Sequence, residues 1–315
     1  MSALAFTIVA LVLSGPVAAL LARSSWPMRA PRAAIVLWQS IALAAVLSAF
    51  SAGISIASRL FVPGLDGRPT ATITSEIDVL GWPLWIAYVV VFALTLMVGG
   101  RLIIAVLQVA IATRRRRAHH RMLVDLLDMP RESVPPPCEH AGQLRILDVE
   151  QPLAYCLPGV RSRVVVSEGT LNTLADSEIN AILIHERAHL RARHDLVLEM
   201  FTAVHAAFPR FVRSASALDA VRLLIELLAD DAAVRAEGPT PLARALVACA
   251  SGRTPSGALA AGGPTTVLRV RRLGGRPNSL AVSATAYLAA AAVLFVPTVA
   301  LAVPWLTELH RLFVA

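Results

Sequence analysis

Four long runs of hydrophobic residues dominate the pattern of this chain. Each is close to, or longer than, the stretch of about 20 residues that an α-helix needs to cross a lipid bilayer. The first run follows Met1 without a basic segment and has no clear cleavage site before Arg23, so we expect a retained helix instead of a signal peptide. The pattern predicts an α-helical integral membrane protein with four transmembrane helices, at about 3–21, 34–57, 82–112 and 280–305.

Two of these runs have irregular features. The third is longer than a bilayer requires and contains Arg101, so we expect either that its lower end leaves the membrane or that this side chain extends to the interface. The fourth contains Pro297 and Pro304. Because proline lacks the amide hydrogen of a helical residue, these positions predict a kink or an early end.

The region between the third and fourth runs, 113–279, predicts a single soluble domain of mainly α, α+β structure. A proline-rich linker at 135–137 precedes two short apolar strands, at 144–149 and 163–167, with a turn at 157–159 between them. Hydrophobic positions then recur with helical spacing, and Asp176 is expected to be an N-cap. Three helices and a loop are expected, at 177–193, 196–208, 217–236 and 251–266 respectively.

Composition supports a membrane protein and narrows its chemistry. The 315 residues are 56% hydrophobic and 16% charged, with a mean hydropathy of +0.65, whereas soluble domains are about 25% charged. A purely cytosolic enzyme is therefore excluded. All 29 basic residues are arginine, which excludes chemistry that depends on lysine. The three cysteines, Cys138, Cys156 and Cys249, are dispersed, which argues against a disulfide framework and against a sulfur-ligated zinc site.

The arginines also predict the orientation in the plasma membrane. Three lie in the loop after the first hydrophobic run and five follow the third run, whereas the second loop is mixed in charge. Because positively charged loops stay cytoplasmic, we expect 113–279 to be cytoplasmic and both termini, including a short tail at 306–315, to be extracytoplasmic. We interpret the run Arg114–Arg117 as an anchor at anionic lipid, so no direct nucleic acid binding is expected.

The residues best suited to metal binding and catalysis lie together in one motif, His185-Glu186-Arg187-Ala188-His189. On a helix, residues four positions apart lie on one face, so both imidazoles can bind the same Zn²⁺ ion. Glu186 lies beside them, where a carboxylate can accept a proton from water at the metal. The motif therefore predicts a zinc site with Glu186 as its catalytic base.

A catalytic zinc site needs a third protein ligand, and three acids compete for this role: Asp195, Glu199 and Glu226. In an unbroken helix, Glu199 would lie about 21 Å along the axis from His185, and Asp195 would point to another face unless the chain breaks. Glu226 lies on a separate expected helix, with Asp230 four residues later on the same face. This spacing favours Glu226 as the ligand and Asp230 as the acceptor that fixes a histidine tautomer.

Two polar neighbours are expected outside the site, and one strand is expected near it. His194 follows the motif but would lie off the metal-binding face of a continuous helix, so we expect a surface residue. Asp231 points away from the face of Glu226 and Asp230. The strand at 163–167 precedes the zinc helix, and we expect it to align an extended peptide by pairing at a sheet edge.

The H-E-x-x-H helix, followed by E-x-x-x-D on a later helix, resembles the gluzincin membrane proteases: HtpX, the CAAX prenyl proteases and the BlaR/MecR antirepressors. The segment HERAHLRARHD, at 185–195, is most similar to the BlaR/MecR pattern, in which an arginine-rich turn ending in aspartate follows the zinc histidines. The order of three spans, cytoplasmic protease and fourth span is also similar, over most of the chain. The resemblance implies a gluzincin metallopeptidase domain with His185, His189 and Glu226 as zinc ligands, Glu186 as base, Asp230 behind a ligand and Asp195 as an auxiliary acid.

The resemblance also implies a role in signal transduction and transcription regulation, through cleavage of a BlaI/MecI-type winged-helix repressor. Full-length BlaR/MecR sensors carry a penicillin-binding domain after the fourth span, where about ten residues follow here. Without lysine, this sequence has no Ser-x-x-Lys acylation site. We therefore expect a short form, similar to actinobacterial members encoded beside a BlaI-type repressor, whose inducing signal is not acylation of this chain.

Two other functions fit the same residues. One is an HtpX-like protease that degrades misfolded membrane proteins. The other is a non-catalytic membrane scaffold that binds the repressor without cutting it, although the intact Glu186 argues against this alternative. Association into homo-oligomers is left open by the sequence.

Overall fold

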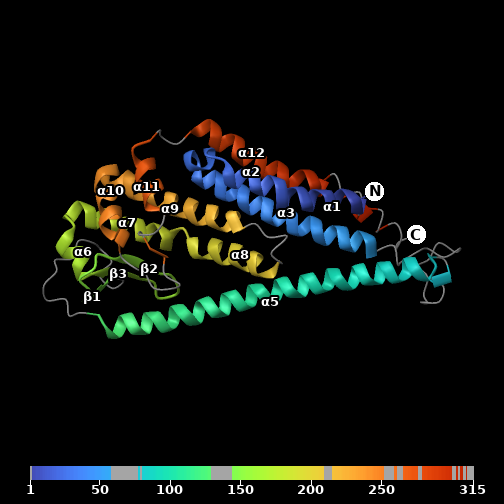
Figure 1. Cartoon of the computed structure of the whole chain (residues 1–315), viewed down its shortest axis with the longest axis horizontal. Helices are drawn as coiled ribbons and strands as arrows, with labels where there is room; N and C mark the ends of the chain where they lie inside the picture. Colours follow the sequence, from blue (N-terminus) through green and yellow to red (C-terminus); the bar gives the residue numbers. More distant parts are fainter. Residues whose placement is uncertain are drawn as a thin grey trace.

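Figure 1 shows the computed structural model of the chain. The structure describes residues 2–57, 77–78, 80–128, 144–208, 215–251, 259–260, 265–275 and 279–299, with the single positions 303, 306, 307 and 310. The expected linker at 135–137 and Cys138 lie outside these residues. Most of 300–305, the end of the expected fourth span, also lies outside them, as does most of the expected tail at 306–315.

The first expected span is a helix in three parts. α1 (Ser2–Val12) is followed by a π-helical turn, η1 (Leu13–Val17), and by α2 (Ala18–Arg23). Pro16 lies within η1. Because its ring crowds the preceding turn and its nitrogen cannot donate, the wider π-helical turn is a natural way to accommodate it.

The remaining expected spans are α3 (Pro31–Ala57), α5 (Trp82–Leu126) and α12 (Leu280–Pro297), and the short helix η2 (Trp26–Arg29) precedes α3. Among the described residues, four helices are long and apolar enough to cross a membrane, as the sequence predicts. Regular α-helix ends at Pro297 in α12, and a π-helical turn follows at 298–299.

α5 is much longer than the third expected span. Its 45 residues extend about 68 Å at 1.5 Å per residue, compared with a hydrocarbon thickness of about 30 Å. The helix therefore continues through the arginine run at 114–117 and reaches the strands that follow it in the chain (Figure 1).

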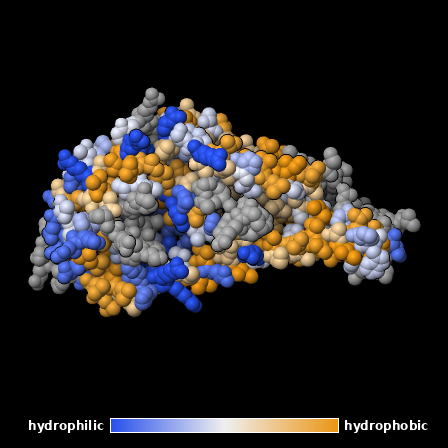
Figure 2. Space-filling model, viewed as in Figure 1, coloured by the Kyte–Doolittle hydropathy of each residue, from blue (hydrophilic) through white to orange (hydrophobic). Residues whose placement is uncertain are grey.

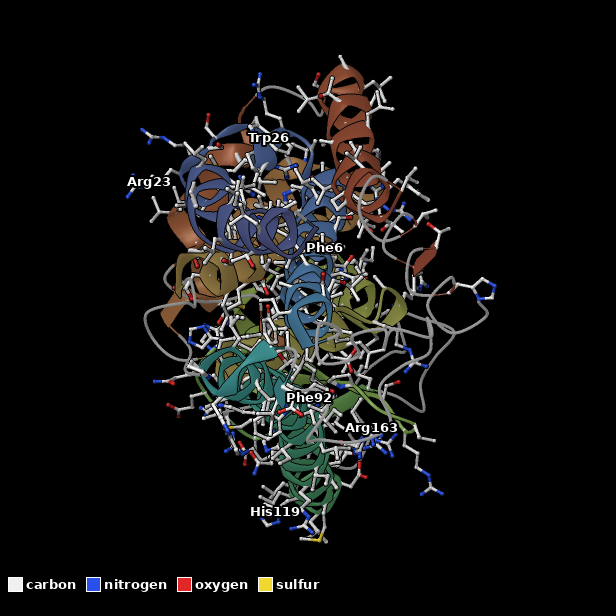
Figure 3. The ribbon with its side chains drawn as sticks, turned by 90° about the vertical axis from the view of Figure 1, so that its right-hand side faces the viewer. Phe6, Arg23, Trp26, Phe92, His119 and Arg163 are labelled. Atoms are coloured by element: carbon white, nitrogen blue, oxygen red, sulfur yellow. The ribbon has the colours of Figure 1, made fainter. Side chains whose placement is uncertain are left out.

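α3 lies in the middle of the membrane bundle, with α1 and α12 packed against it (Figure 1). Its buried face includes Trp38 and Ile41. Viewed along the molecule, Phe6 lies toward the interior of the bundle whereas the exposed Arg23 points away from it (Figure 3). Hydrophobic side chains cover the surface of this part, and hydrophilic ones gather toward the opposite end (Figure 2).

Between α5 and α12, three strands precede the helices and a fourth strand lies between α10 and α11, and together they form a four-stranded sheet. Its order is β1-β3-β2-β4, with β1 parallel to β3 and the other neighbours antiparallel. Because β3 has a partner on both sides, the expectation that this strand pairs with a peptide at a sheet edge is wrong. The strands are β1 (Leu144–Leu147), β2 (Ala154–Leu157), β3 (Arg163–Ser167) and β4 (Leu259–Ala260), the last within the expected loop at 251–266.

The three expected helices of this region correspond to α7, α8 and α9, within two residues at each end. Asp176 begins α7 instead of capping it: Ala175 precedes the helix, and its N–H donates to Oε2 of Glu178 at 3.1 Å. α10, which begins with Pro239, and α11, which begins at Thr266, are additions to the prediction. The helices are α6 (Glu168–Thr173), α7 (Asp176–Arg191), α8 (His194–Ala207), α9 (Ala215–Glu237), α10 (Pro239–Ala248), η4 (Cys249–Ser251) and α11 (Thr266–Leu273).

α8 and α9 lie between α3 and α5 instead of standing clear of the spans (Figure 1). α9 contributes Val221 and Ile225 to the same hydrophobic core as Trp38 of α3. On the other side, Arg101 of α5 donates from Nε to the carbonyl of Ala207, the last residue of α8, at 2.6 Å. This arginine therefore has a protein partner at the negative end of a helix, where a positive charge is favourable.

The loop after the first span meets the far end of the same region. Arg272 of α11 donates from Nε to the carbonyl of Met28 at 2.6 Å, and its guanidinium also pairs with Asp231 at 2.6 Å. Asp231 therefore pairs with a different arginine of α11 from the one that contacts Asp230. This contact places the first loop and α11 at one end of the bundle.

Candidate metal centre

α7 carries the H-E-x-x-H motif into the interior. Its residues Ala181, Ile182 and Leu183 are buried in a core with the sheet, α9 and α10. One turn later, His185 and His189 are both fully buried. Their Nε2 atoms lie 3.2 Å apart, so the spacing of four residues brings both imidazoles to one point, as the motif predicts.

α9 supplies a third donor at this point. Oε2 of Glu226 lies 3.5 Å from Nε2 of His185, and Oε1 lies 3.7 Å from Nε2 of His189. One donor atom from each residue lies within 4.8 Å of the other two. The structure therefore brings together the three residues that the sequence proposes as ligands.

This set of donors fits a zinc ion. Two histidine nitrogens bound to one tetrahedral zinc at 2.0–2.1 Å would be about 3.3 Å apart, and the Nε2 atoms are 3.2 Å apart. The carboxylates of Glu186, Glu226 and Asp230 and the guanidinium of Arg269 surround the point, which gives a formal charge of −2 when all are ionised. A divalent cation would balance that charge.

Glu186 is fully buried beside the ligands. Neither carboxylate oxygen has a hydrogen-bond partner of good geometry among the described residues, although the Cys156 thiol, a weak donor, lies close enough for each group to affect the other's pKa. Burial, with a further contribution from the charge of Glu226, raises the pKa of Glu186 to about 7. A buried acid without a strong partner is suited to accept a proton in a reaction.

Asp230 and Arg269 stand behind His185. Nδ1 of His185 lies 3.0 Å from Oδ1 of Asp230, and Nε and Nη2 of Arg269 donate to the two oxygens of Asp230 at 2.9 and 2.6 Å. Nη1 of Arg269 pairs with Oε2 of Glu226 at 2.9 Å. Burial opposes ionisation of Asp230, but the hydrogen bonds from Arg269 and His185 outweigh it and hold its pKa below the usual range.

The two histidines differ in their environments. Burial disfavours the charged form of both, and it lowers the pKa of His189 to about 3. At His185 the contacts with Asp230 and Glu226 outweigh burial and raise the pKa to about 9. The electrostatic potential is therefore more negative at His185, on the side of the centre that faces Asp230, than at His189.

Arg269 was not foreseen from the sequence. It lies on α11, 39 residues after Asp230, and is 1% exposed. The buried Asp230 and the partly exposed Glu226 on one helix face favour a cation, but the spacing of the arginines in α11 does not identify which of them turns inward.

Residues 6–208, more than half of the chain, match the peptidase family described as BlaR1 peptidase M56. The chain belongs to this family. The match includes His185, Glu186 and His189 and ends before Glu226. No curated protein and no solved structure shows a significant match. The M56 family and the four apolar helices together describe a membrane protein that resembles metallopeptidases.

In this M56 protein, His194 is not the surface residue that its spacing predicts. It is 5% exposed, and its Nδ1 lies 3.0 Å from Nδ1 of His189. The prediction is wrong because α7 does not continue past Arg191. A new helix, α8, begins at His194 after a change of direction.

Asp195 and Glu199 lie in a second charged cluster at the seam between α5 and α8. Nη1 of Arg117 lies 3.0 Å from Oδ2 of Asp195 and 2.8 Å from Oε1 of Glu199. Glu199 is thus outside the group of ligands, and the partner of Asp195 is an arginine of α5. One member of the run expected to anchor at lipid therefore holds the helix that follows the motif.

Neither of the two cysteines that the structure describes belongs to the metal group. Cys156 and Cys249 are buried and free, and burial raises the pKa of both thiols. Cys156 lies in β2 near Glu186, where it contributes to the buried surroundings of that acid.

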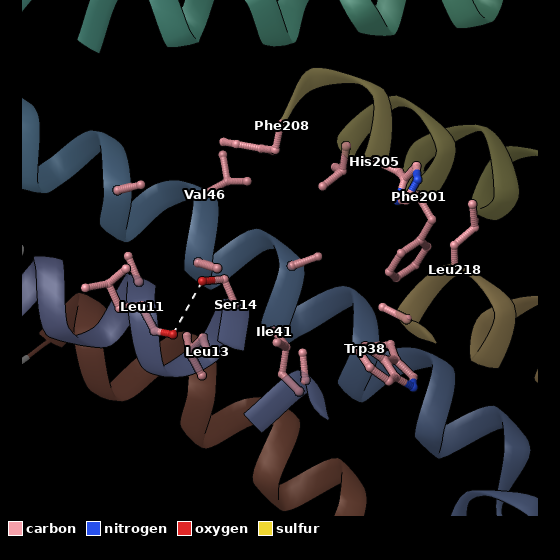
Figure 4. A pocket seen from close by; sticks show the side chains of 17 residues that line it. Leu11, Leu13, Ser14, Trp38, Ile41, Val46, Phe201, His205, Phe208 and Leu218 are labelled. Atoms are coloured by element: carbon pink, nitrogen blue, oxygen red, sulfur yellow. Dashed lines mark hydrogen bonds between the residues drawn. The ribbon is translucent and has the colours of Figure 1, made fainter. Parts of the chain in front are cut away.

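The M56 protein also has a cavity of about 210 Å³ among α1, η1, α3, α8 and α9 (Figure 4). Its walls are mainly apolar, with Trp38, Phe201 and Leu218 among them and Ser14 and His205 as polar members. No ligand of the metal group lines it. The cavity is therefore separate from the candidate metal centre.

Proposed function

We propose that this M56 protein is a zinc-dependent endopeptidase of the gluzincin type. The observation that carries the proposal is the convergence of His185, His189 and Glu226, with the buried acid Glu186 beside them. Two histidines and a glutamate are a ligand set of catalytic zinc in peptidases, in which a fourth position stays open.

A zinc ion held by these residues would polarise a peptide carbonyl and acidify water. Glu186 acts as the general base: it accepts a proton from the attacking water and passes it to the nitrogen of the leaving amine. Its burial strengthens this role because a carboxylate without strong partners has a raised affinity for a proton.

Asp230 orients His185 for coordination. Because Nε2 of His185 faces His189 and Glu226, Nδ1 carries the proton and faces Asp230 at 3.0 Å. Arg269 holds Asp230 with two contacts and keeps one oxygen of Glu226 in place. The pair thus fixes the tautomer of one ligand and the direction of another.

The proposed substrate is a BlaI/MecI-type repressor, cut on the cytoplasmic side of the plasma membrane. The exposed arginines of the first loop and the contact of Met28 with Arg272 support one common side for that loop and the metal centre. The resemblance to BlaR/MecR proteins supports a role in derepression of genes. An HtpX-like protease is the second candidate. It is favoured because α9, which carries Glu226, packs against the apolar span α3.

A test uses the full chain in lipid nanodiscs, with Glu186→Gln as the variant and Glu168→Gln, an exposed glutamate of α6, as the matched control. Zinc is measured by elemental analysis, and cleavage of the repressor and of a misfolded membrane protein is followed in parallel. We expect about one zinc per chain in all three proteins and loss of cleavage only in Glu186→Gln.

The outcomes separate the candidates. Cleavage of the repressor supports an antirepressor, cleavage of the membrane protein alone supports the HtpX-like function, and binding of the repressor without cleavage supports a scaffold. Absence of zinc from the wild type, or equal cleavage by Glu186→Gln, would overturn the zinc peptidase.

A further inference from the structure

The junction between α7 and α8 has an unusual backbone. Arg193 has φ 51° and ψ 42°, in the left-handed region, and among the described residues it is the non-glycine residue with a positive φ. Such a conformation is uncommon without glycine. The side chain of Arg193 is exposed and lies outside the metal centre. The consequence of this turn is therefore the position that it gives to the next residue, His194.

The turn brings His194 back to the metal ligand. In a continuous helix, five residues advance by about 500°, so His194 would lie about 140° around the helix from His189. After the left-handed residue, His194 begins α8 and its ring lies 5.0 Å from that of His189, at an angle of 82° between the planes. The Nδ1 atoms of the two rings are 3.0 Å apart, and both residues are buried.

A metal ion on Nε2 of His189 would fix the direction of this hydrogen bond. Nε2 of His189 faces His185 at 3.2 Å and Glu226 at 3.7 Å, so it is the atom available to a metal ion. Nδ1 of His189 then carries the proton and donates it, since a neutral imidazole has one N–H. Nδ1 of His194 must accept, so His194 is neutral with its proton on Nε2.

The first turn of α8 is held from the other side by α5. Arg117 contacts Asp195, the neighbour of His194, and Glu199 one turn later, at 3.0 and 2.8 Å. The position of His194 is thus fixed by the turn at Arg193 before it and by the ion pairs after it.

We propose that His194 is a positioning residue for the ligand His189, with the function that Asp230 has for His185. The proposal rests on the zinc centre proposed above and adds a residue and a hydrogen-bond direction to it. The two ligands are held differently: Nδ1 of His185 faces a carboxylate at 3.0 Å, whereas Nδ1 of His189 faces a neutral imidazole at 3.0 Å. Loss of such an outer partner weakens metal binding by about 10–100-fold.

The test measures the zinc affinity of the full chain in nanodiscs by competition with a chromogenic chelator. His194→Ala removes the acceptor, whereas His194→Asn keeps an acceptor oxygen near the same place. His119→Ala, an exposed histidine on α5 that points away from the protein (Figure 3), is the control. Arg193→Gly keeps the left-handed turn, because glycine adopts this conformation readily.

We expect His194→Ala to weaken zinc binding by about 10–100-fold, and His194→Asn, Arg193→Gly and His119→Ala to stay close to the wild type. The visible spectrum of the cobalt(II)-substituted protein should change in His194→Ala and return in His194→Asn, which a general loss of stability would not produce. If His194→Ala binds zinc as the wild type does, or His194→Asn is no better than His194→Ala, the proposal is wrong. If the wild type binds no zinc at all, the metal centre itself is wrong.

Discussion

Two regions of this molecule hold an arginine between two acids, yet their chemistry differs. In the metal centre, Arg269 contacts Glu226 at 2.9 Å and Asp230 at 2.6 Å. At the α5–α8 seam, Arg117 contacts Asp195 at 3.0 Å and Glu199 at 2.8 Å. In both regions a charge removed from water is compensated by partners of opposite sign.

The difference lies in what else the acids face. Glu226 and Asp230 also contact His185, and Glu226 contacts His189, so the centre keeps an excess of negative charge that favours a cation. At the seam, Arg117 joins a long membrane helix to the helix after the motif. An arginine between two acids is therefore not a sign of a metal site unless histidines share the acids.

The same substitution in both regions gives the largest expected contrast. Glu226→Gln removes a charged ligand, and we expect zinc affinity to fall by more than about 100-fold, the upper end of what is lost with an outer partner of a ligand. Glu199→Gln should retain zinc, because Glu199 contacts Arg117 and lies outside the ligand group. Elemental analysis after dialysis against a chelator measures both, and equal loss in the two variants would contradict the distinction.

Removal of the arginines should affect stability unequally. Arg269→Ala leaves Asp230, which is fully buried, and Glu226, whose side chain is 15% exposed, without their cation, and we expect a loss of about 3–5 kcal/mol in the free energy of unfolding. Circular dichroism during chemical unfolding of the zinc-free protein measures this loss. Added zinc should restore part of it, and a loss that zinc does not reduce would speak against a shared site.

Arg117→Ala should have a smaller effect. The side chain of Arg117 is 11% exposed, compared with 1% for Arg269, so water screens more of its interactions, and we expect a loss of about 1–2 kcal/mol, between the values for surface and buried pairs. Zinc content should stay that of the wild type. A loss as large as that of Arg269→Ala would show that the seam carries more of the fold than its exposure implies.

The smallest expected effect is a dependence of stability on pH at the contact between His194 and His189. Burial lowers the pKa of His194 from 6.5 to about 4, so the folded protein keeps this residue neutral while the unfolded chain takes up a proton. The contribution of His194 is present above pH 6.5 and declines as the pH falls toward 4. Between pH 7 and 6 it should change by roughly 0.5–1 kcal/mol.

His194→Asn has no titrating group and provides the comparison. The difference in unfolding free energy between this variant and the wild type, both without zinc, should change with pH over this window. A constant difference would indicate that His194 is not held neutral in the folded protein.

The spacing of residues predicted part of the centre well. His185 and His189 meet because a helix repeats at four residues, and Glu226 and Asp230 share a face for the same reason. The hydrophobic runs likewise predicted four membrane helices, because length and apolar character are properties of each segment alone.

Residues that depend on tertiary contacts were missed. Arg269 joins the centre from a helix that follows a long segment with little pattern, and no local spacing marks which arginine is buried. His194 was assigned to the surface because helical periodicity was extended through Arg193, a residue without an evident preference for the left-handed turn that it forms. β3 is expected at an edge because the sequence predicts two strands in this region and not β2, the strand that pairs with the other side of β3.

The most direct test of the central hypothesis is X-ray absorption at the zinc edge on the purified full chain. Coordination by His185, His189 and Glu226 predicts imidazole nitrogen and oxygen scatterers at about 2.0–2.2 Å, with the imidazole signal reduced when His189 is replaced by alanine. A sulfur scatterer at about 2.3 Å, or a wild-type protein that retains no zinc after purification, would contradict it.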